Sequence, residues 1–118
     1  MIKVDSTSNT IFEGIGKMID AMVTDYGKFS YHSKNDEVRK NMFNEYKNDF
    51  KQIVGQKFIK ITNGGSVKAF IVKEDNGKFK MGDILKPASW RAPAKNRARG
   101  NVLEGGYAIQ WTGPLYLK

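Results

Sequence analysis

The spacing of apolar residues changes once along the chain, near residue 56, and this change constrains the fold more than any other feature. Before that point apolar residues recur every three or four positions, as on one face of an α-helix. After it they tend to alternate with polar residues between glycine-rich turns, as in antiparallel strands. The sequence therefore predicts a single α+β domain over residues 1–118. Two N-terminal helices would pack on a small, strongly bent antiparallel β-sheet or partly open barrel.

The first expected helix covers about residues 10–26. A capping-box pattern begins at Thr10, and Gly27 offers a position where the helix can end. Two glycines inside this segment, Gly14 and Gly16, weaken it by roughly 1 kcal/mol each relative to alanine. We interpret them as positions where another backbone packs closely against the helix, in preference to a first turn that frays.

The second expected helix begins with a cap at Asn35 and ends at Gly55. Asp36 and Glu37 follow the cap, where the helix dipole favours negative charge. Apolar residues at spacings of four and three form one stripe along the segment, which is typical of an amphipathic helix. These residues are Val38, Met42, Tyr46, Phe50 and Ile53.

The second half of the chain contains short segments with strand character, separated by turns. The clearest is a hairpin in which the turn at 63–65 joins two apolar segments rich in β-branched residues. The remaining expected elements are turns at 74–78, 82–83 and 112–114 and strands at 107–111 and 115–118.

The net charge of +8 lies entirely in this second half. In residues 1–56 eight cations are balanced by eight acids, whereas residues 57–118 carry twelve cations and only four acids. A neutral helical part joined to a strongly basic β part indicates a division of labour, in which the helices support the fold and the β part meets polyanions.

The most basic segment is 86–101, which contains two prolines and no acid. The prolines fix two backbone angles and remove two hydrogen-bond donors, so the segment is predicted to be a shaped loop between strands. Its cations would neutralise phosphates, its tryptophan would offer a stacking surface, and its asparagines would bind bases or sugars. In the alternative interpretation the loop is merely solvated and Trp90 anchors it to the core. The candidate binding residues are Lys78, Lys80, Lys86, Trp90, Arg91, Lys95, Asn96, Arg97, Arg99 and Asn101.

No pattern in the sequence predicts catalysis, a metal or a cofactor. The chain has no cysteine, and its single histidine, His32, has no neighbouring ligand or nucleophile motif. The GIGK string at 14–17 lacks the spacing of a phosphate-binding loop. We therefore expect a non-enzymatic protein without cofactors. Because neither a signal peptide nor an apolar stretch of about 18 residues is visible, we also expect no membrane association.

The segment KFKMGDILKPASWRAPAKNRARGNVLEGGYAIQWTGPLYL resembles a set of small accessory proteins of tailed bacteriophages. The shared pattern is G-D-I-L, then A-S-W-x-A-P-A-x-N-x-A-R-G-N, then Y-x-I-x-W-T-G-P. Matching positions here are Gly82, Asp83, Trp90, Pro93, Asn96, Arg99, Gly100, Asn101, Trp111 and Gly113. No activity is established for that set. The resemblance therefore implies a phage origin and expression in the cytoplasm of the infected bacterium, and it transfers no catalytic residue.

Two functions from different classes follow from these observations. The favoured one is a phage accessory protein that binds nucleic acid through the cationic loop 86–101, DNA in preference to RNA, mainly through phosphates and with low sequence selectivity. The alternative is a host-takeover or anti-defence protein that inhibits a bacterial protein by direct docking, because a shaped loop with a tryptophan and arginines is also typical of an interface hot spot. A continuous positive groove would favour the first, and a patch of exposed apolar residues would favour the second.

Overall fold

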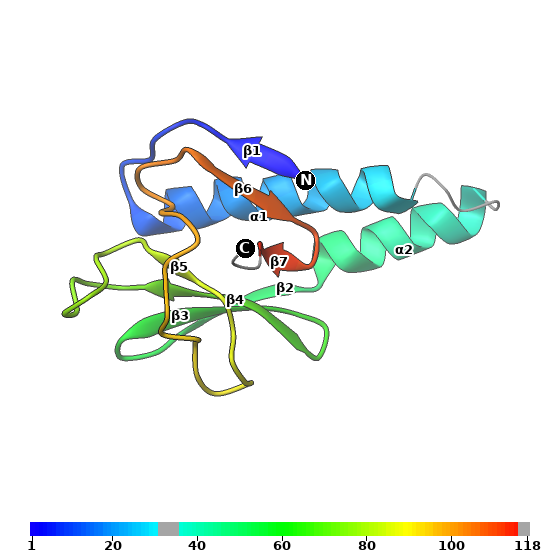
Figure 1. Cartoon of the computed structure of the whole chain (residues 1–118). Helices are drawn as coiled ribbons and strands as arrows, with labels where there is room; N and C mark the ends of the chain where they lie inside the picture. Colours follow the sequence, from blue (N-terminus) through cyan, green and yellow to red (C-terminus); the bar gives the residue numbers. More distant parts are fainter. Residues whose placement is uncertain (31–35, 116–118) are drawn as a thin grey trace.

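The described residues, 1–30 and 36–115, form two helices and two antiparallel sheets in a computed structural model (Figure 1). Helix α1 spans Ile11–Ser30 and helix α2 spans Asp36–Asn48. The strands are β1 (Ile2–Val4), β2 (Phe50–Val54), β3 (Phe58–Asn63), β4 (Ser66–Val72), β5 (Ile84–Leu85), β6 (Tyr107–Gln110) and β7 (Gly113–Pro114).

The strands form one sheet in the order β1-β6-β7 and another in the order β2-β3-β4-β5. Neighbouring strands are antiparallel in both sheets. Neither sheet closes into a barrel in the described part of the chain. The expected α+β class is therefore confirmed, and the partly closed barrel is replaced by two open sheets.

Helix α1 is at the centre of the main hydrophobic core. Ile15, Met18 and Met22 on this helix are fully buried. They cluster with buried residues from both sheets, which are Ile59, Ile61, Ala69, Ile71, Ile84, Tyr107 and Ile109. A second cluster contains Phe70, Val72, Phe79 and Leu85, with Ala98 of the basic segment packed against it. Because side chains alternate between the faces of a strand, α1 covers one face of the β2-β3-β4-β5 sheet and the basic segment lies on the opposite face.

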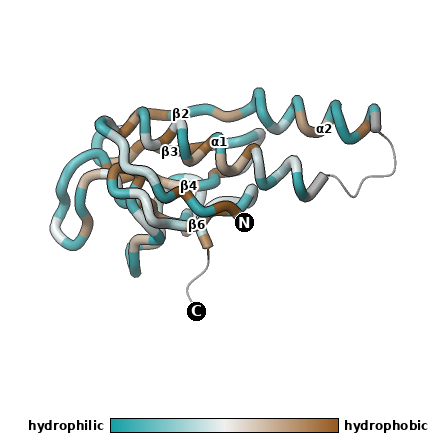
Figure 2. Tube along the Cα trace, turned by 90° about the horizontal axis from the view of Figure 1, so that it is seen from above, coloured by the Kyte–Doolittle hydropathy of each residue, from teal (hydrophilic) through white to brown (hydrophobic). Residues whose placement is uncertain are grey.

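The molecule is elongated, with extents of 48 × 28 × 28 Å. Seen from above (Figure 2), α2 and the end of α1 project beyond the sheets on one side. The connections before β3 and after β4 lie on the opposite side (Figure 1). Helix α2 and these two connections therefore lie at opposite ends of the long axis of the molecule.

The hairpin expected around 63–65 is formed by β3 and β4, which pair over their full length with a bulge after Ile61. Its turn contains Gly64 with a φ of 61°, a left-handed conformation that glycine adopts without strain. The turns expected at 74–78 and 82–83 also form, the first closed by two main-chain hydrogen bonds and the second containing a glycine at positive φ. These expectations are confirmed.

Helix α1 does not end at Gly27 but continues to Ser30. A Cβ atom at Gly27 would lie 3.2 Å from the ring of Phe43 on α2. The small residue therefore serves the close packing of the two helices and not a helix end.

The second helix ends at Asn48 and not at Gly55, so Phe50 and Ile53 belong to β2. Every residue of β2 pairs with β3, and this pairing replaces the helical hydrogen bonds. Phe50 still contacts Tyr46, edge to face with 5.1 Å between ring centroids, although it does so from a strand. The expected cap at Asn35 lies outside the described residues.

Two short strands complete the β1-β6-β7 sheet. The sequence does not predict β1, whose three residues are too few to show a period, but it pairs along its full length with β6. The expected turn at 112–114 contains the two residues of β7. The strand expected at 115–118 lies largely outside the described residues.

The start of α1 has both the expected cap and the expected close contact. The hydroxyl of Thr10 accepts a hydrogen bond from the N–H of Glu13 at 3.1 Å. A Cβ atom at Gly14 would lie 2.4 Å from the carbonyl oxygen of Val102, whereas no atom lies within 4 Å of the corresponding position at Gly16. The interpretation of close packing is therefore confirmed for Gly14 and wrong for Gly16.

This difference gives a matched pair of substitutions. We expect Gly16→Ala to raise the free energy of unfolding by up to about 1 kcal/mol, because alanine favours the helix and meets open space. We expect Gly14→Ala to lower it by about 1–3 kcal/mol, because the methyl group forces α1 away from Val102. Urea denaturation of both variants measures the two changes, and changes of equal sign would contradict the packing described here.

Candidate nucleic-acid interface

The basic segment leaves β5 and returns to it as a folded loop without regular helix, as expected. Ile84 on β5 donates its N–H to Gly100 and accepts the N–H of Arg99, both at 2.8 Å. Pro87 and Pro93 face each other as an isolated bridge, so the two arms of the loop lie together. The loop is therefore fixed at both ends by the sheet that it covers.

A groove lies between this loop and the outer face of the β2-β3 pair, with a volume of about 220 Å³. It is lined by Ile53, Gly55, Gln56, Lys57, Phe58, Lys60, Phe70 and Arg91. Three of these residues are cations, and no acid is among the described residues that line the groove. Phe58 and Phe70 meet edge to face, with 6.1 Å between ring centroids. The groove therefore combines aromatic and apolar walls with positive charge.

Trp90 lies at the surface and not in the core, which answers the question left open by the sequence. Its side chain is 49% exposed. The ammonium of Lys60 lies 4.6 Å from the centroid of its ring and 5.9 Å from that of Phe70. Such cation–π contacts hold the lysine beside the indole. The sheet and the loop thus contribute neighbouring parts of one surface.

A second group of predicted residues extends this surface along the loop. Lys95, Asn96 and Arg97 are exposed. The ammonium of Lys95 lies 5.9 Å from the centroid of the Phe58 ring, which lines the groove. Lys78 donates a hydrogen bond to the main-chain carbonyl of Asn96 and so reaches the loop from the preceding turn.

Asn101 was predicted to be a binding residue, but its side chain is buried, so this prediction is wrong. Its amide donates hydrogen bonds to the carboxylate of Asp83 and to the carbonyl of Met81, both at 3.0 Å. Its side-chain oxygen accepts the N–H groups of Leu103 and Glu104. The side chain therefore organises the chain on either side of the loop and does not reach a ligand.

Three of the predicted cations are engaged within the protein. Lys80 pairs with Glu104, and this hydrogen bond raises the pKa of the lysine. Lys86 donates to the carbonyl of Pro114 at 2.7 Å, and burial, with Arg99 nearby, lowers its pKa. Arg99 is half-buried and donates to the carbonyl of Arg97 at 2.7 Å. Each of the three side chains therefore already has a partner within the protein, and Lys80 is the exposed one.

Lys57, Phe58 and Lys60 were missed by sequence reasoning, because they precede the basic segment by nearly thirty positions. A signal was present in the string KFIKI, where Phe58 and Lys60 are two positions apart and so share one face of a strand.

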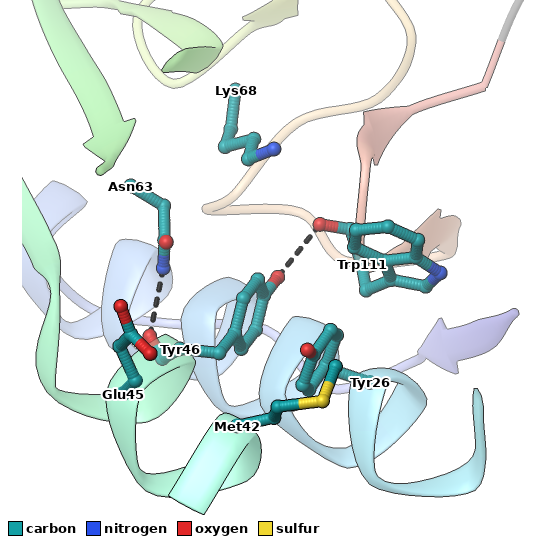
Figure 3. A pocket seen from close by; sticks show the side chains of 7 residues that line it. All are labelled: Tyr26, Met42, Glu45, Tyr46, Asn63, Lys68 and Trp111. Atoms are coloured by element: carbon teal, nitrogen blue, oxygen red, sulfur yellow. Dashed lines mark hydrogen bonds between the residues drawn. The ribbon is translucent and has the colours of Figure 1, made fainter. Parts of the chain in front are cut away.

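A second hollow, with a volume of about 290 Å³, lies between the helices, the β3-β4 hairpin and the β6-β7 turn (Figure 3). It is lined by Tyr26, Met42, Glu45, Tyr46, Asn63, Lys68 and Trp111. The rings of Tyr26 and Tyr46 stack with 4.2 Å between centroids, and Trp111 meets Tyr26 edge-on at 5.3 Å. Because these rings contact one another, the hollow lies along the contact that joins the helices to the β6-β7 turn.

Both helices hold the main chain of Trp111 at this contact. The hydroxyl of Tyr46 on α2 donates to the Trp111 carbonyl at 2.6 Å, as Figure 3 shows. The Trp111 N–H donates to the carboxylate of Asp25 on α1 at 2.9 Å. Burial, together with the nearby Asp25 carboxylate, raises the pKa of Tyr46, so the hydroxyl keeps its proton and remains a donor.

The charge of this second hollow is mixed. Lys68 is half-buried, and burial lowers its pKa. Its ammonium lies 5.9 Å from the centroid of the Trp111 ring, and the carboxylate of Glu45 belongs to the same lining. A polyanion is therefore better matched by the groove beside Trp90 than by this hollow.

Neither a metal site nor a membrane span is visible in the described ranges. No three His, Cys, Asp or Glu side chains in residues 1–30 and 36–115 come together as metal ligands. Within the same ranges, neither helix has the length and apolar character needed to cross a bilayer. The single histidine, His32, lies outside them.

Two tyrosines allow the contact at Trp111 to be tested. Tyr46→Phe removes the hydrogen bond to the Trp111 carbonyl, and we expect it to lower the free energy of unfolding by about 1–2 kcal/mol. The matched control is Tyr107→Phe, because the Tyr107 hydroxyl is buried without a hydrogen-bond partner among the described residues. We expect the control to keep the wild-type stability or to raise it by about 1 kcal/mol, because no hydrogen bond is lost and an unsatisfied buried hydroxyl is itself unfavourable. Chemical denaturation of both variants is the measurement, and equal losses would contradict this account.

Comparisons with known proteins add a family but no activity. No curated protein and no solved structure matches the chain. A family model described as a family of unknown function, DUF7717, matches residues 3–116, which is nearly the whole chain. The chain therefore belongs to the DUF7717 family.

Proposed function

We propose that this protein is a non-enzymatic accessory protein of a tailed bacteriophage that binds nucleic acid in the cytoplasm of the infected bacterium. Binding is mainly to phosphates and has low sequence selectivity, with DNA preferred to RNA. One observation carries the proposal: Lys57, Lys60 and Arg91 line a single groove that has no acid among its described lining residues. The exposed Trp90 stands beside these cations.

Low selectivity is proposed because neither of the two described helices contributes a residue to the lining of this groove. Helix α1 packs on the opposite face of the β2-β3-β4-β5 sheet. Sequence-selective DNA-binding proteins usually insert a helix or a β-ribbon into the major groove, whereas cations on a loop and a sheet face contact the phosphate backbone. The surface supplies charge and stacking, and these depend weakly on sequence.

The groove cations are tested by a salt titration of DNA binding. We expect Lys57→Gln/Lys60→Gln/Arg91→Gln to weaken binding and to reduce the log-log dependence of affinity on salt by about 2–3 for duplex DNA, because each lost phosphate contact removes ~0.9. Fluorescence anisotropy with a labelled oligonucleotide at several salt concentrations measures both quantities.

The control variant also loses three positive charges, but it loses them on the helices and not in the groove. Lys28, Lys40 and Lys47 are exposed on the helices, and the variant in which all three become glutamine should keep the wild-type salt dependence to within about 1. Equal effects of the two variants would show that net charge acts without the groove, and no binding by the wild type at low salt would refute the proposal.

A second candidate function, inhibition of a bacterial protein by direct docking, is favoured by the exposed edge of β2. This strand is at the end of its sheet, and no described strand pairs with its outer side. Ile53 and Val54 are 45% and 54% exposed. The N–H of Gly55 bonds to the carbonyl of Phe58, so by alternation the main-chain groups of Gln52 and Val54 point away from β3. A partner could add a strand at this edge.

Proline at Gln52 tests this second candidate. Gln52→Pro removes an outward N–H and leaves the β2-β3 hydrogen bonds in place, so it should block an added strand without unfolding the hairpin. Gln52→Ala, which keeps the N–H, is the control. If docking uses this edge, a host protein captured by the wild type and by Gln52→Ala should be lost from Gln52→Pro. Capture that is equal for all three would exclude strand addition at β2.

A further inference from the structure

We infer that the groove between the basic loop and β2-β3 selects nucleic acid with unpaired bases, so that single strands bind more tightly than duplexes. This inference rests on the proposed function and specifies its substrate class. The candidate residues for base contact are Trp90, Phe58 and Ile53, and those for phosphate contact are Lys57, Lys60, Arg91 and Lys95.

The first argument is the position of Trp90. Half of this large side chain remains in water, and it is the aromatic residue of a segment that contains five cations. Local contacts fix the loop around Trp90. Pro87 and Pro93 bring the arms of the loop together, and the Ser89 hydroxyl accepts hydrogen bonds from the N–H groups of Arg91 and Ala92 at 3.3 and 3.2 Å. An indole held in place at the surface loses little further freedom when a base stacks on it.

The second argument is the composition of the groove. Its apolar walls are Ile53, Phe58 and Phe70, and cations stand around them. A volume of about 220 Å³ is several times the ~30 Å³ of a water molecule and admits a flat ring system. Apolar and aromatic surface is of no use to a phosphate, but it matches the faces of a base. The groove therefore offers both kinds of contact that a nucleotide needs, apolar and aromatic surface for the base and positive charge for the phosphate.

The third argument is that a duplex cannot use these groups. Paired bases are stacked on one another and present only their edges in the grooves, so their faces are closed to Trp90 and Phe58. A duplex would contact the cations alone, whereas a single strand would contact the cations and the rings. Because base–aromatic stacking contributes a factor of about 5- to 100-fold per base, the same phosphates should give a measurable preference for open strands.

The experiment compares four labelled probes by fluorescence anisotropy at one salt concentration. They are a deoxythymidine strand of about 12 nucleotides, the corresponding uridine strand, a duplex of the same length, and a strand of abasic sites that keeps the phosphates and lacks the bases. We expect the thymidine strand to bind at least about 10-fold more tightly than the duplex and the abasic strand. The uridine strand differs from the thymidine strand in the 2′-hydroxyl and in the missing 5-methyl group, and we expect it to bind less tightly, in line with the proposed preference for DNA.

Variants at Trp90 assign the preference to stacking. Trp90→Ala should lose about 5- to 100-fold in affinity for the thymidine strand and little for the abasic strand or the duplex. Trp90→Phe, which keeps an aromatic ring at the same position, should keep most of the affinity for the thymidine strand. Circular dichroism confirms that both variants fold, which is expected because the side chain is at the surface.

The outcomes separate the inference from the function on which it rests. Equal affinity for all probes, or an equal loss for all probes in Trp90→Ala, would refute the selection of unpaired bases while nucleic-acid binding itself stands. A duplex preferred over the thymidine strand would refute it as well. Absence of binding to every probe at low salt would refute the proposed function, and the inference would fail with it.

Discussion

The fold depends on the burial of α1 between the two sheets. Ile15, Met18 and Met22 are fully buried on this helix, and each such side chain contributes about 1.5–3 kcal/mol relative to exposure. The backbone of Val102 can approach only because position 14 has no side chain. This arrangement decides where a partner can bind. With α1 occupying one face of the β2-β3-β4-β5 sheet, the face that carries Lys60 is the one left for the basic loop and for any ligand.

The loop proposed to bind a ligand lies on a rigid support, because each neighbouring segment is fixed by specific contacts. The loop continues directly from β5, and two main-chain hydrogen bonds of Ile84 on that strand hold its C-terminal end at Arg99 and Gly100. The β6-β7 turn is held by the helices through the main chain of Trp111. A Cβ atom at Gly113 would lie 2.5 Å from the carbonyl of Lys68, so β7 lies directly against β4 without a ladder between them. Loops that carry binding residues on such a scaffold can present them with little loss of entropy.

The two helices, the β3-β4 hairpin and the basic loop could be predicted from the sequence, because each follows from a local pattern. The end of the second helix could not, since Phe50 and Ile53 fit its period and only pairing with the distant β3 makes them a strand. The contacts of individual cations could not be predicted either. The charge of the segment predicted Lys86 to be a binding residue like its neighbours, yet its ammonium donates a hydrogen bond to the Pro114 carbonyl of β7. Lys60 was outside the basic segment, yet it lies over Trp90. Asn101 was grouped with the loop, yet it is buried. In each of these cases a contact with a residue distant in the sequence determines where the side chain lies.

The two candidate functions compete for one part of the molecule, and Ile53 shows why. Its side chain lines the groove beside Lys60, while its strand is the exposed edge of the sheet. A strand added at β2 would place its own side chains next to Ile53 on the groove side, because neighbouring strands share their faces. Such a partner would narrow or close the groove from that side. Binding of a nucleic acid there would in turn hinder a protein at the β2 edge. The two proposed functions would therefore exclude each other at a single surface, and occupation of the groove is expected to weaken docking at the edge.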